Sequence, residues 1–181
     1  FVDRAVKIAT NGYPGAVHLS LPVDIMFSHF AEDAGREERP FDLGMQQPAR
    51  AWPEPARLQQ LLQKLNNAKR PVLIGGHGVW WAKAEAKLEE AGRLLGIPVF
   101  NIPYHQKLLG EECEAYMGLA DIHQYHPSAD AFRDADLVLM IGGRLDNQMN
   151  FGNPPLFPSS AELVCVNGSH EEIEFNRAAD F

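Results

Sequence analysis

The sequence is poor in the features that mark secreted, membrane and nucleic-acid-binding proteins. It has only two cysteines, Cys113 and Cys165, too few for a disulfide framework, which favours a reducing, cytoplasmic setting. No apolar run is long enough to span a bilayer. The net charge is −8 and no basic face is visible, so we expect neither a nucleic acid nor a membrane as a partner.

The chain nevertheless holds enough apolar material for a folded core. Of its 181 residues, 45% are hydrophobic and 22% are charged, which is typical of one globular domain or of one domain plus a fragment. It begins with Phe1 rather than methionine, and its first residues show no basic and apolar signal pattern. We therefore expect an excised piece or a processed product.

The central feature is the stretch Pro-Val-Leu-Ile-Gly-Gly-His-Gly at residues 71–78. Its short apolar run predicts a buried parallel strand, which ends in Gly75, Gly76 and Gly78. A helix is predicted to follow over residues 79–95. A strand, a glycine turn and a helix let backbone N–H groups approach a phosphate. Because the full G-x-G-x-x-G fingerprint is absent, a tight βα turn without a ligand remains the alternative.

The same alternation of strands and helices continues along the chain. Further helices are predicted at 54–68 and 126–135, and further strands at 97–102, 136–141 and 161–166. Irregular segments are expected at 103–125 and 147–160, and the start of another helix at 171–176. Strands that alternate with helices predict an α/β fold with a mostly parallel sheet and right-handed crossovers.

The residues before these units have a different character. Residues 1–11 predict a helix and residues 16–21 a strand, but these two elements cannot form a core alone. We interpret residues 1–25 as the end of a preceding domain, residues 26–53 as a linker, and residues 54–181 as the main domain.

Candidate binding residues follow the ends of the predicted strands. Gly142, Gly143 and Arg144 form a second glycine-rich strand end, and Asn167 follows the last strand. Ligands of parallel sheets bind beyond the carboxyl ends of the strands, at a topological switch point. The guanidinium of Arg144 suits a phosphate or an adenine nucleotide. No catalytic group or metal-ligand spacing stands out, so we predict none.

Five stretches together resemble thiamine-diphosphate enzymes of the acetolactate synthase type. Residues 12–24 resemble the end of that family's pyrimidine-binding domain, which reads roughly G-R-P-G-P-V-x-L-x-L-P-x-D. The other four stretches resemble motifs of its central domain; they are residues 68–76, 96–99, 134–146 and 172–177. The resemblance covers nearly the whole chain apart from the linker.

The resemblance implies a fold and a set of binding residues. The fold would be a Rossmann-like three-layer α/β/α domain with a six-stranded, mostly parallel sheet of the DHS-like FAD/NAD-binding type. Such central domains bind FAD, bind ADP or are empty. Seven positions match the family's nucleotide-contacting stretches: Gly75, Gly76, Gly78, Gly142, Gly143, Arg144 and Asp146. We add Asn167, which follows the last predicted strand, as a further candidate binding residue. His77 and Asn167-Gly168 depart from the family pattern, which commonly has a glycine and an acidic residue there.

The resemblance also implies an activity that this chain does not carry alone. The family's activating glutamate and its Gly-Asp-Gly motif for thiamine diphosphate and Mg²⁺ lie in other domains, and no Gly-Asp-Gly occurs here. The full protein would be a 2-keto acid carboligase or decarboxylase, dimeric or tetrameric, with its other domains as partners. Two alternatives stay open: a free-standing NAD- or ADP-binding module, and a purely structural or oligomerisation domain.

Overall fold

The structure is a computed structural model that describes residues 1–12, 14–29, 51–103, 108–121, 127–173 and 176–181. The chain divides into two units, Phe1–Trp52 and Pro53–Phe181. Most of the predicted linker at 26–53 lies outside the described residues, so its character stays a prediction.

The first unit exposes most of its apolar side chains. Its described residues form two helices, α1 (Val2–Thr10) and α2 (Val23–Met26), and neither helix buries a residue. Residues 16–21, predicted as a strand, form no strand. The prediction was wrong because a strand needs a neighbour for its backbone hydrogen bonds, and the described part of this unit supplies none.

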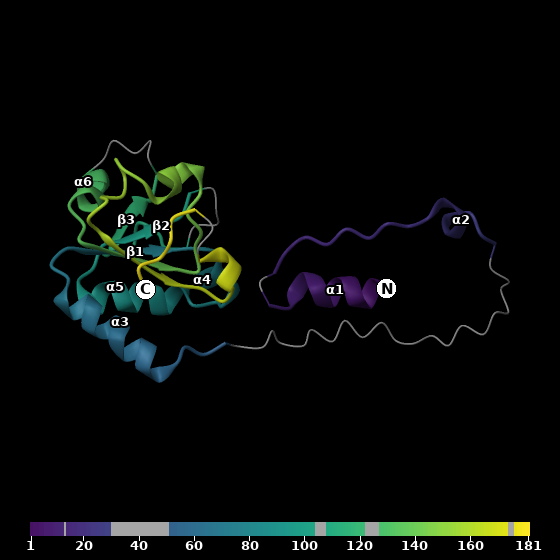
Figure 1. The fold of residues 1–181 in the computed structure, drawn as a ribbon, viewed down its shortest axis with the longest axis horizontal. Coiled ribbons are helices and arrows are strands. Elements are labelled where there is room, and N and C mark those ends of the chain that lie inside the picture. Colours follow the sequence, from purple (N-terminus) through teal and green to yellow (C-terminus); the bar gives the residue numbers. More distant parts are fainter. Residues whose placement is uncertain (13, 30–50, 104–107, 122–126, 174–175) are drawn as a thin grey trace. The chain divides into compact units, whose positions relative to one another are not determined.

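The second unit is built on a parallel sheet of five strands in the described part of the chain (Figure 1). The strands are β1 (Pro71–Gly75), β2 (Val99–Asn101), β3 (Tyr116–Leu119), β4 (Leu137–Ile141) and β5 (Glu162–Val166). Their order is β3-β2-β1-β4-β5, and all neighbours are parallel. The chain runs outward from β1 to β3 and then returns to β4, so the switch point lies between β1 and β4.

Four of the five strands were predicted from the sequence, but β3 was missed. It lies inside the segment expected to be irregular, and it contains Gly118 with a φ of 111°. It is an edge strand whose residues are only partly buried, so it lacks the continuous apolar run that marks the inner strands.

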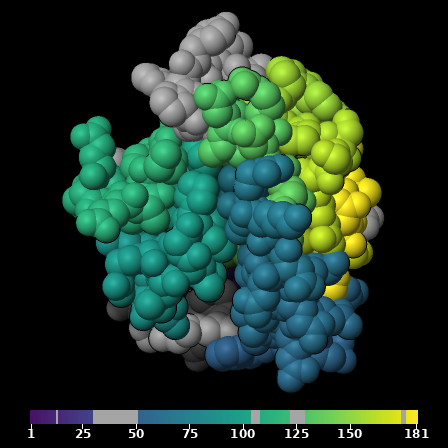
Figure 2. Space-filling model, turned by 90° about the vertical axis from the view of Figure 1, so that its left-hand side faces the viewer, coloured from purple at the N-terminus to yellow at the C-terminus, as the bar shows by residue number. Residues whose placement is uncertain are grey.

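Three helices cover one face of the sheet. They are α3 (Pro55–Asn67), α4 (His77–Trp81) and α5 (Glu85–Leu95). Leu61 and Leu65 of α3 and Leu88 of α5 pack against Leu73 and Val99 of the sheet. In Figure 2 the blue surface of α3 adjoins the teal surface of the segment that follows β1.

The helix predicted over residues 79–95 is interrupted. It is divided into α4 and α5 at Lys83, whose φ is 52°. The amide of Ala84 donates to the carbonyl of Val79 across this turn at 3.0 Å. The break leaves Val79 and Leu88 both buried, at 3% and 4% exposure, so burial on the sheet outweighs the cost of one left-handed residue.

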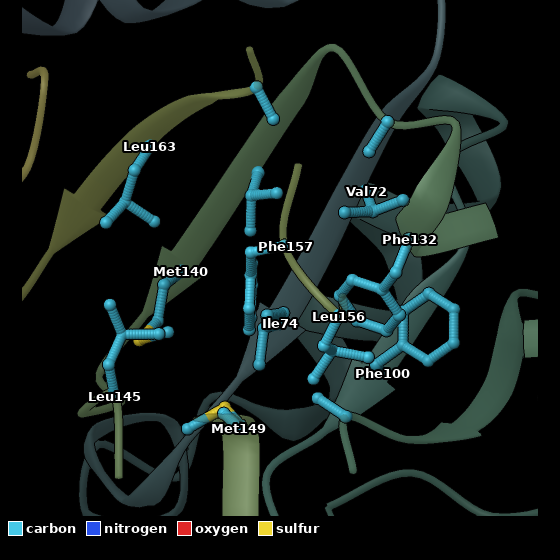
Figure 3. Close-up of a cluster of buried hydrophobic side chains, with 14 of the residues drawn as sticks. Val72, Ile74, Phe100, Phe132, Met140, Leu145, Met149, Leu156, Phe157 and Leu163 are labelled. Atoms are coloured by element: carbon cyan, nitrogen blue, oxygen red, sulfur yellow. The ribbon is translucent and has the colours of Figure 1, made fainter. Parts of the chain in front are cut away.

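The opposite face is covered by α6 (Pro127–Arg133) and by the segment after β4 (Figure 3). The ring of Phe132 of α6 contacts that of Phe100 at a tilt and that of Phe157 edge to face, with centroids 4.2 and 5.5 Å away. Ile74 and Met140 of the central strands complete this cluster. Helical layers on both faces confirm the predicted three-layer α/β/α fold, although the described residues form five strands where the resemblance implied six.

Two short 3₁₀ helices replace predicted irregular or helical segments. The first is η1 (Asn147–Gly152), inside the segment expected to be a loop; it is kinked, because Asn150 and Phe151 have φ angles of 49° and 54°. The second is η2 (His170–Glu172), where a longer helix over residues 171–176 was expected. Residues 174 and 175 of that expectation lie outside the described part. Among the described helices, none has the length and apolar character needed to cross a bilayer.

Candidate functional site

The glycine-rich ends of β1 and β4 meet at the switch point. The amide of Gly76 donates to the carbonyl of Ile141 at 2.9 Å, and the amide of Gly78 donates to the carbonyl of Gly142 at 2.8 Å. The amide of Gly142 in turn donates to Val166 at 2.7 Å. The predicted convergence of these strand ends on one rim of the sheet is therefore confirmed, and we call Gly76, Gly78, Gly142 and Gly143 the glycine seam.

The glycine seam exists because two backbone turns are in direct contact. A Cβ on Gly76 would lie 2.5 Å from the carbonyl oxygen of Gly142 and 2.7 Å from the amide nitrogen of Gly143. Gly142 also has a φ of 63°, a conformation that favours glycine. The packing of the two turns therefore requires glycine at positions 76 and 142 whether or not a ligand binds.

Gly75 has a different environment from the seam. A Cβ there would lie 2.5 Å from Cδ2 of Leu88 and 3.1 Å from Cδ1 of Leu108. Both neighbours are buried side chains of the layer that carries α5. The structure thus gives Gly75 a role in helix–sheet packing, and its predicted contact with a nucleotide stays a prediction.

Arg144 follows the seam and places a positive charge at this rim. Its Nη1 atom lies 3.8 Å from Oε2 of Glu172, and its side chain is half exposed. His77 begins α4 on the other turn; burial lowers the pKa of its imidazole, and the charge of Arg144 lowers it further. Glu172 and Asp146 act on the His77 pKa in the opposite direction.

Asp146 and Asn167 already make hydrogen bonds within the chain. Oδ1 of Asp146 caps η1 by accepting from the amides of Gln148 and Met149 at 3.0 and 3.4 Å. Asn167 donates from Nδ2 to the carbonyl of Gly143 at 3.0 Å and accepts at Oδ1 from Ser169. Both residues thus help to fix the loops at this rim.

Two buried acceptors near the strand ends lack a hydrogen-bond partner. Among the described residues they are Oδ1 of Asn101 and Oε1 of Gln148. Asn101 is the last residue of β2, is 1% exposed and lies opposite Gly75 in the sheet register. Unpartnered buried acceptors are costly, so they favour a ligand or a water that donates hydrogen bonds. Neither residue was predicted as a site residue, because an isolated Asn or Gln belongs to no sequence motif that indicates binding.

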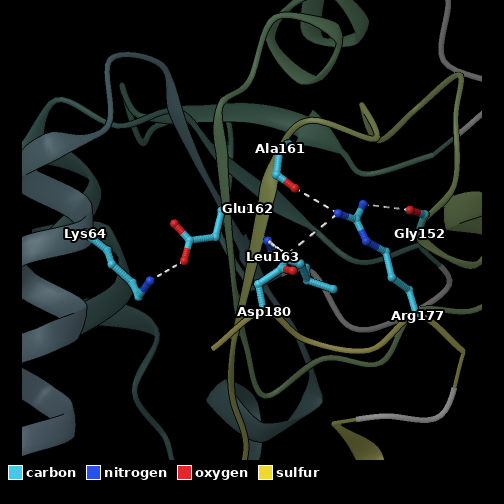
Figure 4. Close-up of polar contacts among 7 residues, drawn as sticks. All are labelled: Lys64, Gly152, Ala161, Glu162, Leu163, Arg177 and Asp180. Carbon is cyan, nitrogen blue, oxygen red and sulfur yellow. Dashed lines mark hydrogen bonds and ion pairs between the residues drawn. The ribbon is translucent and has the colours of Figure 1, made fainter.

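The residues after β5 make hydrogen bonds at the edge of the sheet (Figure 4). Arg177 donates to the carbonyls of Gly152 and Ala161 at 3.0 and 2.8 Å. Asp180 accepts from the amide of Leu163 at 2.8 Å. These bonds give Arg177, from the family-like stretch at residues 172–177, a structural role. Glu172 of the same stretch faces Arg144 and was not predicted as a site residue.

These residues fit an adenine nucleotide in part. The amides of Gly76, Gly78 and Gly142 donate to backbone carbonyls, so they do not form the phosphate cradle that the glycine pattern suggested. Arg144 provides a guanidinium for a phosphate, and the two unpartnered acceptors suit the amino group of adenine or a ribose hydroxyl. No group of three His, Cys, Asp or Glu side chains in the described part of the chain is placed to hold a metal ion.

Comparison with known proteins identifies relatives of the second unit. A family model described as "Thiamine pyrophosphate enzyme, central domain" matches residues 58–181. The chain is 24% identical over 189 residues to a 2-hydroxyacyl-CoA lyase of Arabidopsis thaliana, covering 97% of this chain and 30% of that protein. It is 28% identical over 170 residues to the acetolactate synthase large subunit of Corynebacterium glutamicum, covering 94% of this chain and 26% of that protein.

Solved structures show the same fold. A thiamine diphosphate-dependent 4-hydroxybenzoylformate decarboxylase of Rhodococcus jostii RHA1 superposes with a TM-score of 0.61 at 19% identity, covering 73% of this chain and 25% of that one. A putative thiamin diphosphate-dependent enzyme from Mycobacterium smegmatis gives a TM-score of 0.58 at 21% identity, covering 74% and 27%. The chain thus spans less than a third of the length of the relatives it matches.

Proposed function

The chain belongs to the thiamine pyrophosphate enzyme family through its central domain, and on that premise we propose that it forms part of an enzyme that makes or breaks a carbon–carbon bond beside a carbonyl group. The match of the family model to residues 58–181 carries the proposal. Thiamine diphosphate with Mg²⁺ supplies the carbanion-stabilising chemistry in such an enzyme.

Two substrate classes follow from the relatives. The presence of acetolactate synthases among the relatives supports a 2-keto acid as the substrate, which would be decarboxylated and joined to a second carbonyl compound. The presence of 2-hydroxyacyl-CoA lyases among the relatives supports cleavage of a 2-hydroxyacyl thioester instead. We take the 2-keto acid carboligase or decarboxylase as the first candidate and the lyase as the second.

The chain's own role in this enzyme would be structural. It contains no Gly-Asp-Gly motif, and its described residues offer no metal cluster. The residues that bind thiamine diphosphate and Mg²⁺ would lie in pyrimidine- and diphosphate-binding domains outside this chain. The exposed apolar side chains of the first unit, such as Ile25, Met26 and Phe27, suit packing against the rest of a preceding domain. The isolated chain should therefore be inactive.

We further propose that FAD or ADP binds at the switch point between β1 and β4. Arg144 would hold a phosphate, while Asn101 and Gln148 would accept hydrogen bonds from the base or the ribose. The predicted contacts from Gly75, Gly76, Gly78, Gly142, Gly143, Asp146 and Asn167 belong to the same proposal. The glycine seam then positions the site rather than donating amides to the ligand.

Two experiments test this function. The full-length protein, supplied with thiamine diphosphate and Mg²⁺, should release CO₂ from a panel of 2-keto acids or cleave a 2-hydroxyacyl-CoA, and the 181-residue chain should do neither. Flavin fluorescence after denaturation would reveal FAD, and calorimetry with ADP would reveal ADP. If neither FAD nor ADP binds, the alternative of a purely structural domain is supported. Tight NAD binding without thiamine-dependent turnover would instead support the free-standing nucleotide-binding module.

A further inference from the structure

The guanidinium that suits a phosphate already faces a carboxylate of the same chain. Arg144 Nη1 and Glu172 Oε2 are 3.8 Å apart. The side chain of Glu172 is only 19% exposed, whereas that of Arg144 is 51% exposed. A sheltered carboxylate therefore lies beside a guanidinium that reaches into solvent, at the rim where a nucleotide phosphate would bind.

The placement of Glu172 is fixed by hydrogen bonds that start at the turn carrying Arg144. The carbonyl of Gly143 accepts from Asn167 at 3.0 Å, and Asn167 accepts from the amide of Ser169 at 3.2 Å. Ser169 is the N-cap of η2, the 3₁₀ helix that presents Glu172. The seam turn and the carboxylate are thus linked by two successive hydrogen bonds through Asn167.

The carboxylates that act on His77 also oppose a phosphate at Arg144. Glu172 and Asp146 both act on His77 as negative charges, which places two carboxylates near the imidazole. Burial, and next the charge of Arg144, lower the pKa of His77, so the imidazole is neutral at neutral pH. Of the described charged groups that act on His77, two are carboxylates and one is a guanidinium. A carboxylate and a phosphate compete for the same guanidinium donors.

We propose that Glu172 is an internal competitor for the phosphate at Arg144. A nucleotide phosphate then binds tightly only when this carboxylate is displaced or neutralised, and Glu172 sets the affinity of the switch-point site for phosphorylated ligands. The inference rests on the proposed nucleotide site and adds a residue that limits its occupancy.

The test compares E172Q with the wild-type protein by calorimetry, using ADP and adenosine as probes. E172Q should bind ADP about tenfold more tightly, because one negative charge near the phosphates is removed. Adenosine has no phosphate, so its affinity should change by less than about twofold. The matched control is E171Q, which removes the neighbouring, exposed carboxylate of η2 and should leave ADP binding unchanged.

Each outcome separates this inference from the proposed site. If the wild-type protein binds ADP and E172Q binds it equally or more weakly, the competition is overturned while the nucleotide site stands. If ADP binds to neither protein, and both keep the same unfolding temperature, the competition and the ADP form of the proposed site both fail, and only FAD remains to be tested there. If E172Q unfolds early, the E172D variant decides. Aspartate keeps the charge but is shorter by one methylene, so competition at Arg144 requires E172D to bind ADP more tightly than the wild type and adenosine with unchanged affinity.

Discussion

Replacing Gly76 with alanine should strongly destabilise the sheet-bearing unit. The new Cβ would lie 2.5 Å from the carbonyl oxygen of Gly142 and 2.7 Å from the amide nitrogen of Gly143. Both neighbours are backbone atoms, so no change of rotamer relieves the contact, and the two strand-end turns would have to separate. Separation would also stretch the hydrogen bonds from Gly76 to Ile141 and from Gly78 to Gly142.

The size of the effect follows from these two losses. Overpacking a well-packed site costs about 1 to 3 kcal/mol, and a rigid backbone neighbour places the cost near the upper end. Two weakened hydrogen bonds add about 0.5 to 1.5 kcal/mol each. A total of about 4 to 6 kcal/mol is a large share of the stability of an average domain and would lower the unfolding temperature by about 15 to 25 °C.

Thermal and urea unfolding of the ligand-free chain, followed by circular dichroism, measures this effect. Gly168→Ala is the matched control, because Gly168 also follows a strand and a Cβ there would meet no atom within 4 Å. It should change the stability by less than about 0.5 kcal/mol. Unfolding temperatures of G76A and G168A that agree within about 2 °C would refute the conclusion that the glycine seam is a packing contact.

Three titratable groups give further predictions. Asp136→Ala should cost about 1 to 2 kcal/mol, because its exposed carboxylate accepts from the amides of Lys69 and Arg70 at 2.7 and 2.9 Å. Burial raises the Asp136 pKa, but these bonds outweigh it and hold the pKa below 3.8, so the stabilisation should be lost as the pH falls below that value. The lowered pKa of His77 predicts that stability decreases as the pH falls below 6.5, and His77→Asn should flatten that dependence. Burial raises the pKa of Cys165 to about 11, so at pH 8 its alkylation, followed by peptide mass spectrometry, should be roughly 100-fold slower than that of an exposed thiol.

Each of these has a result that would contradict it. An Asp136→Ala protein as stable as the wild type at neutral pH would show that the two amide bonds contribute nothing net. Parallel stability profiles of the wild type and His77→Asn between pH 7.5 and 5 would exclude a depressed pKa in the folded state. Rapid alkylation of Cys165 at pH 8 in the native protein would show that its thiol is not held in the protonated form.

The central strands could be predicted from the sequence because burial on both faces gives a continuous apolar signal. Val72 to Ile74 and Leu137 to Ile141 are such runs, and both were located correctly. The edge strand around Tyr116 lacks that signal because its residues are only partly buried. The segment 16–21 has the alternation of a strand but no partner in the described part of the chain, so a local pattern could not determine its structure.

The candidate site was predictable in its location but not in its bonding. Glycines after β1 and β4 indicated that two turns converge, and Gly76 and Gly143 do lie together. The sequence could not reveal that the amide of Gly76 donates to a backbone carbonyl, since that depends on how the two turns meet. The pairing of Arg144 with Glu172 joins residues that are far apart in the sequence, and no local spacing predicts it.

The most direct test of the central claim is thiamine-dependent turnover by the full-length protein, compared with the 181-residue chain. The account predicts that the full-length protein converts a 2-keto acid or a 2-hydroxyacyl-CoA only when thiamine diphosphate and Mg²⁺ are added, and that the chain alone stays inactive with both present. Turnover by the chain alone, or turnover by the full-length protein that is independent of thiamine diphosphate, would contradict it.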